Sequence, residues 1–235
     1  METVSTNRSF AGTQGVYSHA SAETGTEMTF AVYVPDHEQG VKLPVVWYLS
    51  GLTCTHANVM EKGEYRRAAS DLGLIIVAPD TSPRGEDVAD DEAYDMGQGA
   101  GFYVDATEEP WAKHFRMRSY IEKELPALIA KEFPADMERQ AIFGHSMGGH
   151  GALTIALRNP DRYKSVSAFS PIVSPLNCPW GEKALGGYIG NDKAAWREYD
   201  ACALIEDGAR VADILVDQGT ADNFLEEQLK PQLLA

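Results

Sequence analysis

The apolar residues of this chain gather in short continuous runs, and segments with helical spacing lie between them. Residues 45–49 and 74–78 are such runs, which are typical of strands buried on both faces of a sheet. Residues 28–34 largely alternate between apolar and polar positions and end at Pro35, as a half-buried strand does. Further candidate strands are 8–18, 141–143, 166–169 and 214–216, and helical patterns cover 57–71, 116–132, 147–158 and 223–234.

Strands that alternate with helices predict an α/β fold with a doubly wound, mostly parallel sheet flanked by helices. No internal repeat or low-complexity linker interrupts residues 1–235, so we expect a single domain. The segment 81–113 breaks the rhythm with Pro83 and several glycines among many acids. A loop of this length is usually functional or disordered. Its aromatic end at 101–105 favours an ordered position near a site, and a surface excursion anchored by aromatics is the alternative.

The most informative motif is Gly144-His145-Ser146-Met147-Gly148, which lies between an apolar run at 140–143 and a helical stretch at 149–158. A strand, a sharp turn with serine, and a helix form the nucleophile elbow of α/β-hydrolases. The backbone at such a serine is strained, and the flanking glycines are needed where a Cβ would collide with the neighbouring strand and helix. We therefore predict that Ser146 is a nucleophile.

A serine nucleophile needs an acid that orients its base, and in this fold the acid follows a later strand. The loop after 214–216 contains two carboxylates, Asp217 and Asp222. Asp217 is too close to the strand end to reach over easily, so Asp222 is the favoured acid. The alternative role of Asp222 is an N-cap of the following helix.

Two backbone amides should stabilise the oxyanion of the tetrahedral intermediate. Met147 follows the nucleophile and supplies one of them. The loop after residues 45–49 supplies the other, which we place at Leu52, although this loop could also be an ordinary turn.

The general base is harder to find, because none of the six histidines follows Asp222 in the sequence. The side chain of His145 should point away from the serine hydroxyl, into packing, and His150 should lie a helical turn behind the elbow. His56 lies in the oxyanion loop, where a position between Ser146 and Asp222 would be strained. His114 precedes the helical pattern at 116, and His19 and His37 lie in early loops. We expect instead that a last strand, a histidine-bearing loop and a last helix follow residue 235.

Composition excludes several classes of function. The formal net charge of −15 disfavours nucleic acid and anionic lipid as partners. There is no apolar stretch long enough to span a membrane and no export signal at the N-terminus, so we expect a cytoplasmic protein. Three cysteines without CxxC spacing indicate neither a disulfide framework nor a structural zinc site.

The chain resembles the S-formylglutathione hydrolases, the esterase D group of α/β-hydrolases. The similarity runs from about residue 10 to the end, and the matching stretches are 49–55, 78–85, 99–107, 144–152, 169–181 and 217–222.

This resemblance implies hydrolysis of S-formylglutathione to formate and glutathione, with Ser146 as nucleophile, Asp222 as acid, and Leu52 and Met147 as oxyanion donors. It implies no metal or organic cofactor, a homodimer, and a triad histidine beyond residue 235. A general short-chain carboxylesterase is the alternative enzyme, and a non-catalytic binding module is the alternative outside enzymes.

Three further residues are predicted to line the substrate pocket. Cys54 matches a cysteine near the active site of the family, and its alternative role is a small buried hydrophobe. Phe102 and Trp180 are expected to form pocket walls, with core packing as the alternative for each.

Overall fold

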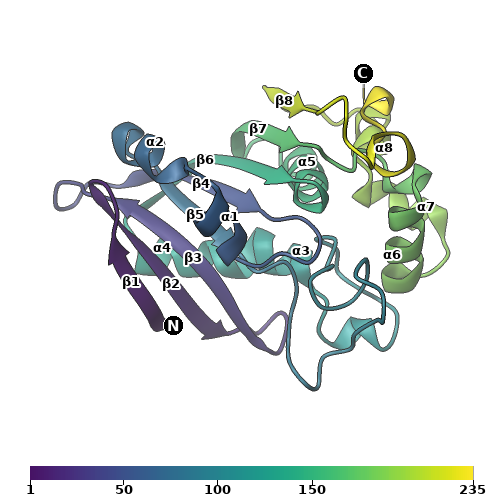
Figure 1. Ribbon diagram of the computed structural model, residues 1–235, viewed down its shortest axis with the longest axis horizontal. Coiled ribbons are helices and arrows are strands. Elements are labelled where there is room, and N and C mark those ends of the chain that lie inside the picture. Colours follow the sequence, from purple (N-terminus) through teal and green to yellow (C-terminus); the bar gives the residue numbers. More distant parts are fainter. Residues whose placement is uncertain (235) are drawn as a thin grey trace.

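The computed structural model describes residues 1–234, and a twisted eight-stranded sheet runs through its centre (Figure 1). The strand order is β1-β2-β3-β5-β4-β6-β7-β8. The strands are β1 (Glu2–Arg8), β2 (Gly12–Ala20), β3 (Glu27–Pro35), β4 (Leu43–Leu49), β5 (Ile75–Pro79), β6 (Ala135–His145), β7 (Tyr163–Phe169) and β8 (Ile214–Asp217).

The two halves of this sheet differ in strand direction. β1, β2, β3 and β5 pair antiparallel, whereas β5, β4, β6, β7 and β8 are mutually parallel. The chain passes from β4 outward to β5 and later returns to β6 on the other side of β4. This change of direction makes the carboxyl ends of β4 and β6 a topological switch point, where ligands bind in open α/β sheets.

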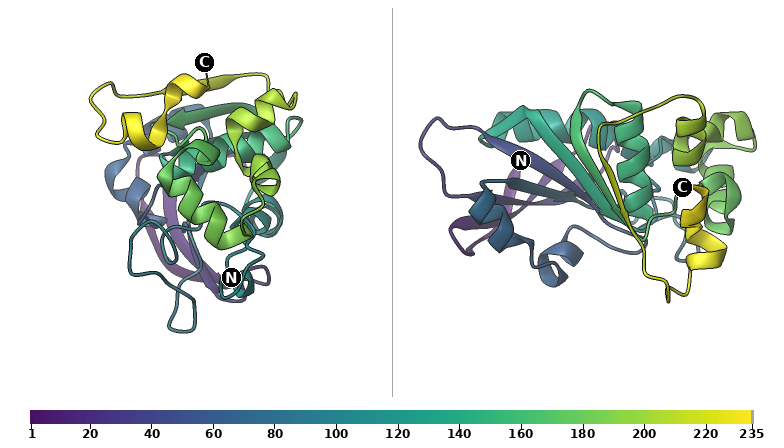
Figure 2. Two further views of the ribbon diagram at one scale, coloured as in Figure 1. Left: turned by 90° about the vertical axis from the view of Figure 1, so that its right-hand side faces the viewer. Right: turned by 90° about the horizontal axis from the view of Figure 1, so that it is seen from above.

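Helices cover both faces of the sheet, as expected for a doubly wound fold. α1 and α2 lie on one face, and α4 and α5 lie on the other (Figure 2). α6, α7 and α8 gather beyond the carboxyl ends of the parallel strands (Figure 1). The helices are α1 (Ala57–Lys62), α2 (Tyr65–Leu72), α3 (Met117–Ser119), α4 (Leu125–Glu132), α5 (Met147–Arg158), α6 (Pro179–Ile189), α7 (Lys193–Trp196) and α8 (Ala201–Glu206). Shorter 3₁₀ or π turns are η1 (Trp111–Lys113), η2 (Tyr120–Glu124), η3 (Pro175–Asn177), η4 (Arg197–Tyr199), η5 (Leu225–Leu229) and η6 (Pro231–Leu233).

The fold class predicted from the sequence is confirmed, but several elements differ. The helical pattern at 57–71 is two helices, because the chain turns at Gly63 into an extended conformation. The pattern at 223–234 forms only η5 and η6: Lys230 adopts a left-handed conformation, and Pro231 cannot continue a helix.

Four elements were not predicted. β1 is exposed at every position and therefore shows no apolar alternation. α6 contains three glycines, which lower helix propensity. The sequence nevertheless marks where this helix begins, because Pro179 occupies its first turn, directly after the capping residue Cys178. α7 and α8 likewise begin after capping aspartates, Asp192 and Asp200.

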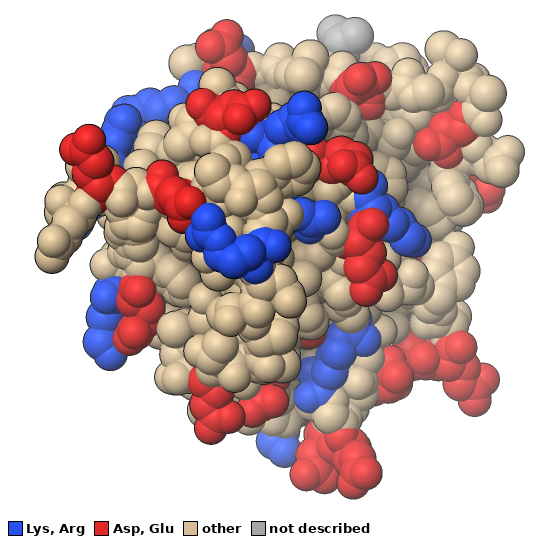
Figure 3. All heavy atoms as spheres, turned by 60° about the vertical axis from the view of Figure 1, so that its left-hand side comes forward, with Lys and Arg blue, Asp and Glu red and all other residues tan. Residues whose placement is uncertain are grey.

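The segment 81–113 returns to the core at its aromatic end. Phe102 and Tyr103 are fully buried, and the Tyr103 hydroxyl donates to the carbonyl of Ser50 at 2.8 Å. The expectation that this end is ordered is confirmed, and it supports the loop that follows β4. On the face in Figure 3, acidic and basic side chains are interspersed.

Candidate active site

Ser146 lies at the sharp turn between β6 and α5. Its backbone has φ 58° and ψ −119°, a conformation that non-glycine residues rarely adopt. Its amide donates to the carbonyl of Phe169 on β7 at 2.9 Å. The turn thus presents the serine at the carboxyl edge of the sheet, as a nucleophile elbow does.

Two glycines allow this turn. A Cβ on Gly144 would overlap the carbonyl group of Gly148, and a Cβ on Gly148 would overlap that of Leu49 on β4. Both close approaches are between backbones, so no side-chain movement could relieve them. The spacing of the two glycines around Ser146 therefore has a steric reason.

A pocket of about 360 Å³ opens beside Ser146 at the switch point of the sheet. Its walls come from the loop after β4, the segment 81–113, the elbow, α6 and the chain after β8. The lining residues are Gly51, Leu52, Thr53, Cys54, Tyr94, His145, Ser146, Ser170, Trp180, Asp222, Phe224 and Leu229.

The oxyanion loop, residues 50–54, passes directly beside the elbow. A Cβ placed on Gly51 would lie 3.2 Å from the Cβ of Ser146. The Thr53 amide donates to Gly99 at 2.9 Å, and the Cys54 amide donates to Gly51 at 3.3 Å. Leu52, which lies between Gly51 and Thr53 in the sequence, lines the pocket.

Met147 is buried, and it is the first residue of α5, where backbone amides have no partner within the helix. The Met147 amide is therefore not used in the hydrogen bonds of the helix and can donate to another group.

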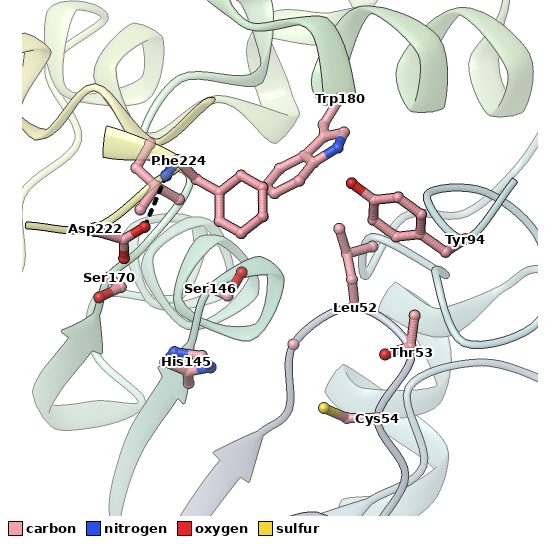
Figure 4. A pocket seen from close by; sticks show the side chains of 12 residues that line it. Leu52, Thr53, Cys54, Tyr94, His145, Ser146, Ser170, Trp180, Asp222 and Phe224 are labelled. Atoms are coloured by element: carbon pink, nitrogen blue, oxygen red, sulfur yellow. Dashed lines mark hydrogen bonds between the residues drawn. The ribbon is translucent and has the colours of Figure 1, made fainter. Parts of the chain in front are cut away.

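Asp222 lines the pocket, whereas its competitor Asp217 does not. The carboxylate of Asp222 accepts from the Phe224 amide at 2.9 Å and lies 3.5 Å from the Gln218 side-chain nitrogen. Figure 4 shows Asp222 beside Ser170, on one side of Ser146. The bond to Phe224 uses Oδ1 and resembles the alternative capping role, whereas Oδ2 is the oxygen near Gln218.

The three predicted pocket residues have different positions. Cys54 is half-buried at the pocket wall, and burial raises the pKa of its thiol. Trp180 is largely buried and lines the pocket from α6. Phe102 is fully buried outside this wall, where its carbonyl and ring contact His150. The interpretation of Phe102 as a pocket wall is therefore corrected: its side chain packs in the core.

His145 also requires a correction. Its side chain lies on the other side of the turn from the Ser146 hydroxyl, but it is exposed at the pocket rather than packed (Figure 4). Although His145 is exposed at the pocket, partial desolvation of its ring lowers its pKa, and the charge of Asp222 opposes part of that shift.

The other five histidines have partners elsewhere, and none lines the pocket. Burial lowers the pKa of His150 to about 4, so it is neutral at pH 7. The ring nitrogens lie 3.1 Å from Tyr120 Oη (His19), 2.9 Å from the Pro35 carbonyl (His37), 2.7 Å from Asp80 (His56), 2.7 Å from the Thr24 carbonyl (His114) and 3.0 Å from the Phe102 carbonyl (His150). The placement of the triad histidine after residue 235 stays a prediction.

Four pocket residues were not predicted from the sequence: Tyr94, Ser170, Phe224 and Leu229. Ser170 directly follows β7 and has φ 45°. Its position after an apolar run, at the carboxyl end of a predicted strand, could have marked it as a pocket residue from the sequence. Tyr94 and Phe224 belong to loops, and no periodicity marks an aromatic side chain in a loop.

Comparison with known proteins agrees with this geometry. Residues 21–235 match the family model described as "Putative esterase". The chain is 57% identical over 234 residues to the S-formylglutathione hydrolase of Paracoccus denitrificans (strain Pd 1222), covering all of this chain and 84% of that protein. It is 51% identical to the S-formylglutathione hydrolase of Mus musculus, covering 98% of this chain and 83% of that protein.

The chain belongs to the S-formylglutathione hydrolase family. A solved structure of the S-formylglutathione hydrolase from Agrobacterium tumefaciens superposes with a TM-score of 0.98 at 64% identity, covering 100% of this chain and 85% of that one. In this family member, no helix within residues 1–234 is both long and apolar enough to cross a membrane. Over the same residues, no three His, Cys, Asp or Glu side chains cluster as a metal site would require.

Proposed function

We propose that this protein hydrolyses S-formylglutathione to formate and glutathione through an acyl-enzyme at Ser146. The observation that carries the proposal is the strained serine at the switch point, which shares one pocket with Leu52 and Asp222. Relatives at 57% and 51% identity that carry this enzyme name support the choice of substrate.

In the first half-reaction, Ser146 Oγ adds to the thioester carbonyl carbon, and its proton passes to a general base. The amides of Leu52 and Met147 donate to the oxyanion, and removal of one such donor typically costs about 10²–10³ in rate. Collapse of the intermediate breaks the carbon–sulfur bond, and the thiolate takes up the proton as glutathione leaves.

In the second half-reaction, water adds to the formyl-serine, and formate leaves as Ser146 regains its proton. Asp222 orients and stabilises the base in both steps. The resemblance implies a histidine after residue 235 as that base, while His145 is the histidine that lines the pocket. No step requires a metal or an organic cofactor.

Labelling tests the nucleophile directly. After treatment with a fluorophosphonate and digestion, the adduct is expected on Ser146 and absent from Ser146→Ala. Labelling of another serine, or labelling that survives the substitution, would refute the assignment and favour a non-catalytic module.

Kinetics test the substrate. We expect kcat/KM for S-formylglutathione to exceed that for a p-nitrophenyl ester of similar acyl size. An advantage of tenfold or more for the simple ester, about 1.4 kcal/mol of transition-state binding, would make a general short-chain carboxylesterase the better interpretation.

We further propose that residues 1–235 form one α/β-hydrolase domain of a cytoplasmic homodimer. The continuous sheet supports one domain, and three free cysteines, Cys54, Cys178 and Cys202, suit a reducing compartment. The dimer rests on the resemblance, and light scattering of the purified protein tests it.

A further inference from the structure

An ion-pair cluster lies beside the pocket but outside its lining. Lys183 Nζ lies 2.9 Å from Asp91 Oδ1 and 2.5 Å from Asp95 Oδ1. Lys183 belongs to α6, three residues after the pocket residue Trp180, whereas the two aspartates belong to the segment 81–113. The cluster therefore joins the helix that forms one pocket wall to a loop that is distant in sequence.

The loop carries a high density of negative charge, which this contact partly offsets. Six carboxylates occur between residues 86 and 95: Glu86, Asp87, Asp90, Asp91, Glu92 and Asp95. They repel one another, and residues 90–94 are exposed, so burial does not hold them. Lys183 supplies a positive charge that bridges two of them.

The next part of the loop is anchored independently. Met96 is buried, and the Tyr188 hydroxyl accepts from the Gly97 amide and donates to the Ala100 carbonyl, both at 2.8 Å. Tyr94 thus lies at the junction between an anchored segment and an exposed tip. The aspartates on either side of it are the ones that Lys183 binds.

Tyr94 completes the aromatic wall of the pocket. Its ring meets the Trp180 ring edge-on, with centroids 6.3 Å apart and an interplanar angle of 84°. Tyr94 itself is 55% exposed, so little packing holds it in place from the outer side. Its position over the pocket consequently depends on the contacts of its neighbours.

The chemistry indicates which part of the substrate this wall meets. The leaving sulfur must receive its proton from the base that Asp222 orients, so the leaving group lies on the Asp222 side. Figure 4 shows Tyr94, Trp180 and Leu52 on the opposite side of Ser146 from Asp222. The acyl group of a thioester attacked by Ser146 therefore extends toward Tyr94 and Trp180.

We propose that Tyr94 limits the size of the acyl group, and that Lys183 is a positioning residue that holds Tyr94 in place through Asp91 and Asp95. This inference rests on the proposed acyl transfer at Ser146. While Tyr94 stays packed edge-on against Trp180, the pocket accepts a formyl group. When Tyr94 is free to move away from Trp180, the pocket also accepts longer acyl chains.

The test compares S-formylglutathione with S-butyrylglutathione, and the same acyl groups on p-nitrophenol, in the full-length protein. The readout is the butyryl-to-formyl ratio of kcat/KM. We expect this ratio to rise on the order of tenfold in Tyr94→Ala and about threefold in Lys183→Met. The reason is that a closed apolar wall excludes the extra methylene groups of the butyryl chain, and each variant opens that wall. Lys193→Met is the matched control, since Lys193 makes a 3.5 Å ion pair with Glu182 in which both side chains are largely exposed. Its ratio should stay at the wild-type value.

Salt provides a second measurement. The side chains of Lys183 and Asp91 are about one-third exposed, so 0.5 M NaCl should weaken their ion pair and raise the wild-type ratio. The ratio of Lys183→Met should not respond. If Lys183→Met does not fold, the double variant Asp91→Asn, Asp95→Asn replaces it with the same expectation.

An active wild type whose ratio is unchanged in Tyr94→Ala would overturn the size limit. A ratio that changes in Tyr94→Ala but not in the Lys183 or aspartate variants would overturn the positioning role. A wild type that cleaves neither the thioester nor the ester would instead refute the proposed function, and the inference with it.

Discussion

The two catalytic residues proposed here, Ser146 and Asp222, are held in opposite ways. Ser146 lies between central elements, β6 and α5, and backbone contacts on both sides fix its conformation. Asp222 lies in a loop after β8, between that strand and η5. Hydrogen bonds within this loop are local: the Asp222 amide donates to the Gly219 carbonyl, and the Asp222 carboxylate accepts from the Phe224 amide.

If Ser146 and Asp222 act as proposed, the nucleophile and its acid are held with different amounts of freedom. The serine oxygen must reach the carbonyl carbon along a fixed direction, so its backbone is held by packing that cannot relax. The acid acts through the base, and local hydrogen bonds at a loop are enough to present a carboxylate. Substitutions in the two regions should therefore fail in different ways.

Removal of the nucleophile should have the largest effect on activity. We expect Ser146→Ala to lower kcat by roughly 10⁶-fold, because no other hydroxyl occupies the elbow. The melting temperature should not fall, since the change removes a side-chain oxygen from a strained site. Thioester hydrolysis and thermal melting measure the two quantities, and residual turnover within a hundredfold of wild type would refute the assignment.

Neutralisation of the acid should cost less activity and little stability. Asp222→Asn should lower kcat by about 10⁴-fold, whereas the amide oxygen can still accept from Phe224. Asp217→Asn is the control, because Asp217 does not line the pocket and should retain wild-type turnover. The opposite ranking of the two variants would make Asp217 the acid.

Glycine substitutions measure the rigidity of the two regions directly. Gly148→Ala places a Cβ against the Leu49 carbonyl and should lower the free energy of unfolding by about 3 kcal/mol or more. Gly219→Ala, in the acid loop, meets nothing within 4 Å and should change it by less than about 0.5 kcal/mol. Urea unfolding gives both values, and equal effects would remove the contrast.

His145 tests whether the elbow also supplies the base. His145→Gln should lower kcat by less than about tenfold, since its ring lies on the far side of the turn from the serine hydroxyl. A loss comparable to that of Asp222→Asn would identify His145 as the general base and would contradict the expected histidine after residue 235.

Cys54 should give the smallest change in turnover. Cys54→Ser is expected to remain active and to resist N-ethylmaleimide, which should inhibit the unmodified protein by obstructing the pocket. Because burial raises the pKa of this thiol, the thiolate is scarcer at pH 7 than for a free cysteine. Inactivation should therefore accelerate as the pH rises past the usual thiol value of about 8.5. A pH-independent rate, or a folded but inactive Cys54→Ser, would point to a different role.

The local sequence pattern was sufficient for the elbow and for the buried strands. Apolar runs predicted β4 and β5 because both faces of those strands are covered, and the glycines around Ser146 reported steric limits set within a few residues. The same approach missed β1, whose residues are all exposed, and α6, whose glycines contact the side chain of Met96 and the backbone of Pro175.

The sequence by itself determined the α/β class and the serine elbow between β6 and α5, because each leaves a pattern in residues close together in the chain. Only the tertiary structure decided which side chains share the pocket. The structure places Phe102 in the core and His145 at the surface, packs Tyr94 against Trp180, and pairs Lys183 with Asp91 and Asp95. The contacts of Tyr94 and Lys183 join segments that are distant in the sequence. No periodicity records them, because the approach of two distant segments is set by the packing of the whole sheet and its helices.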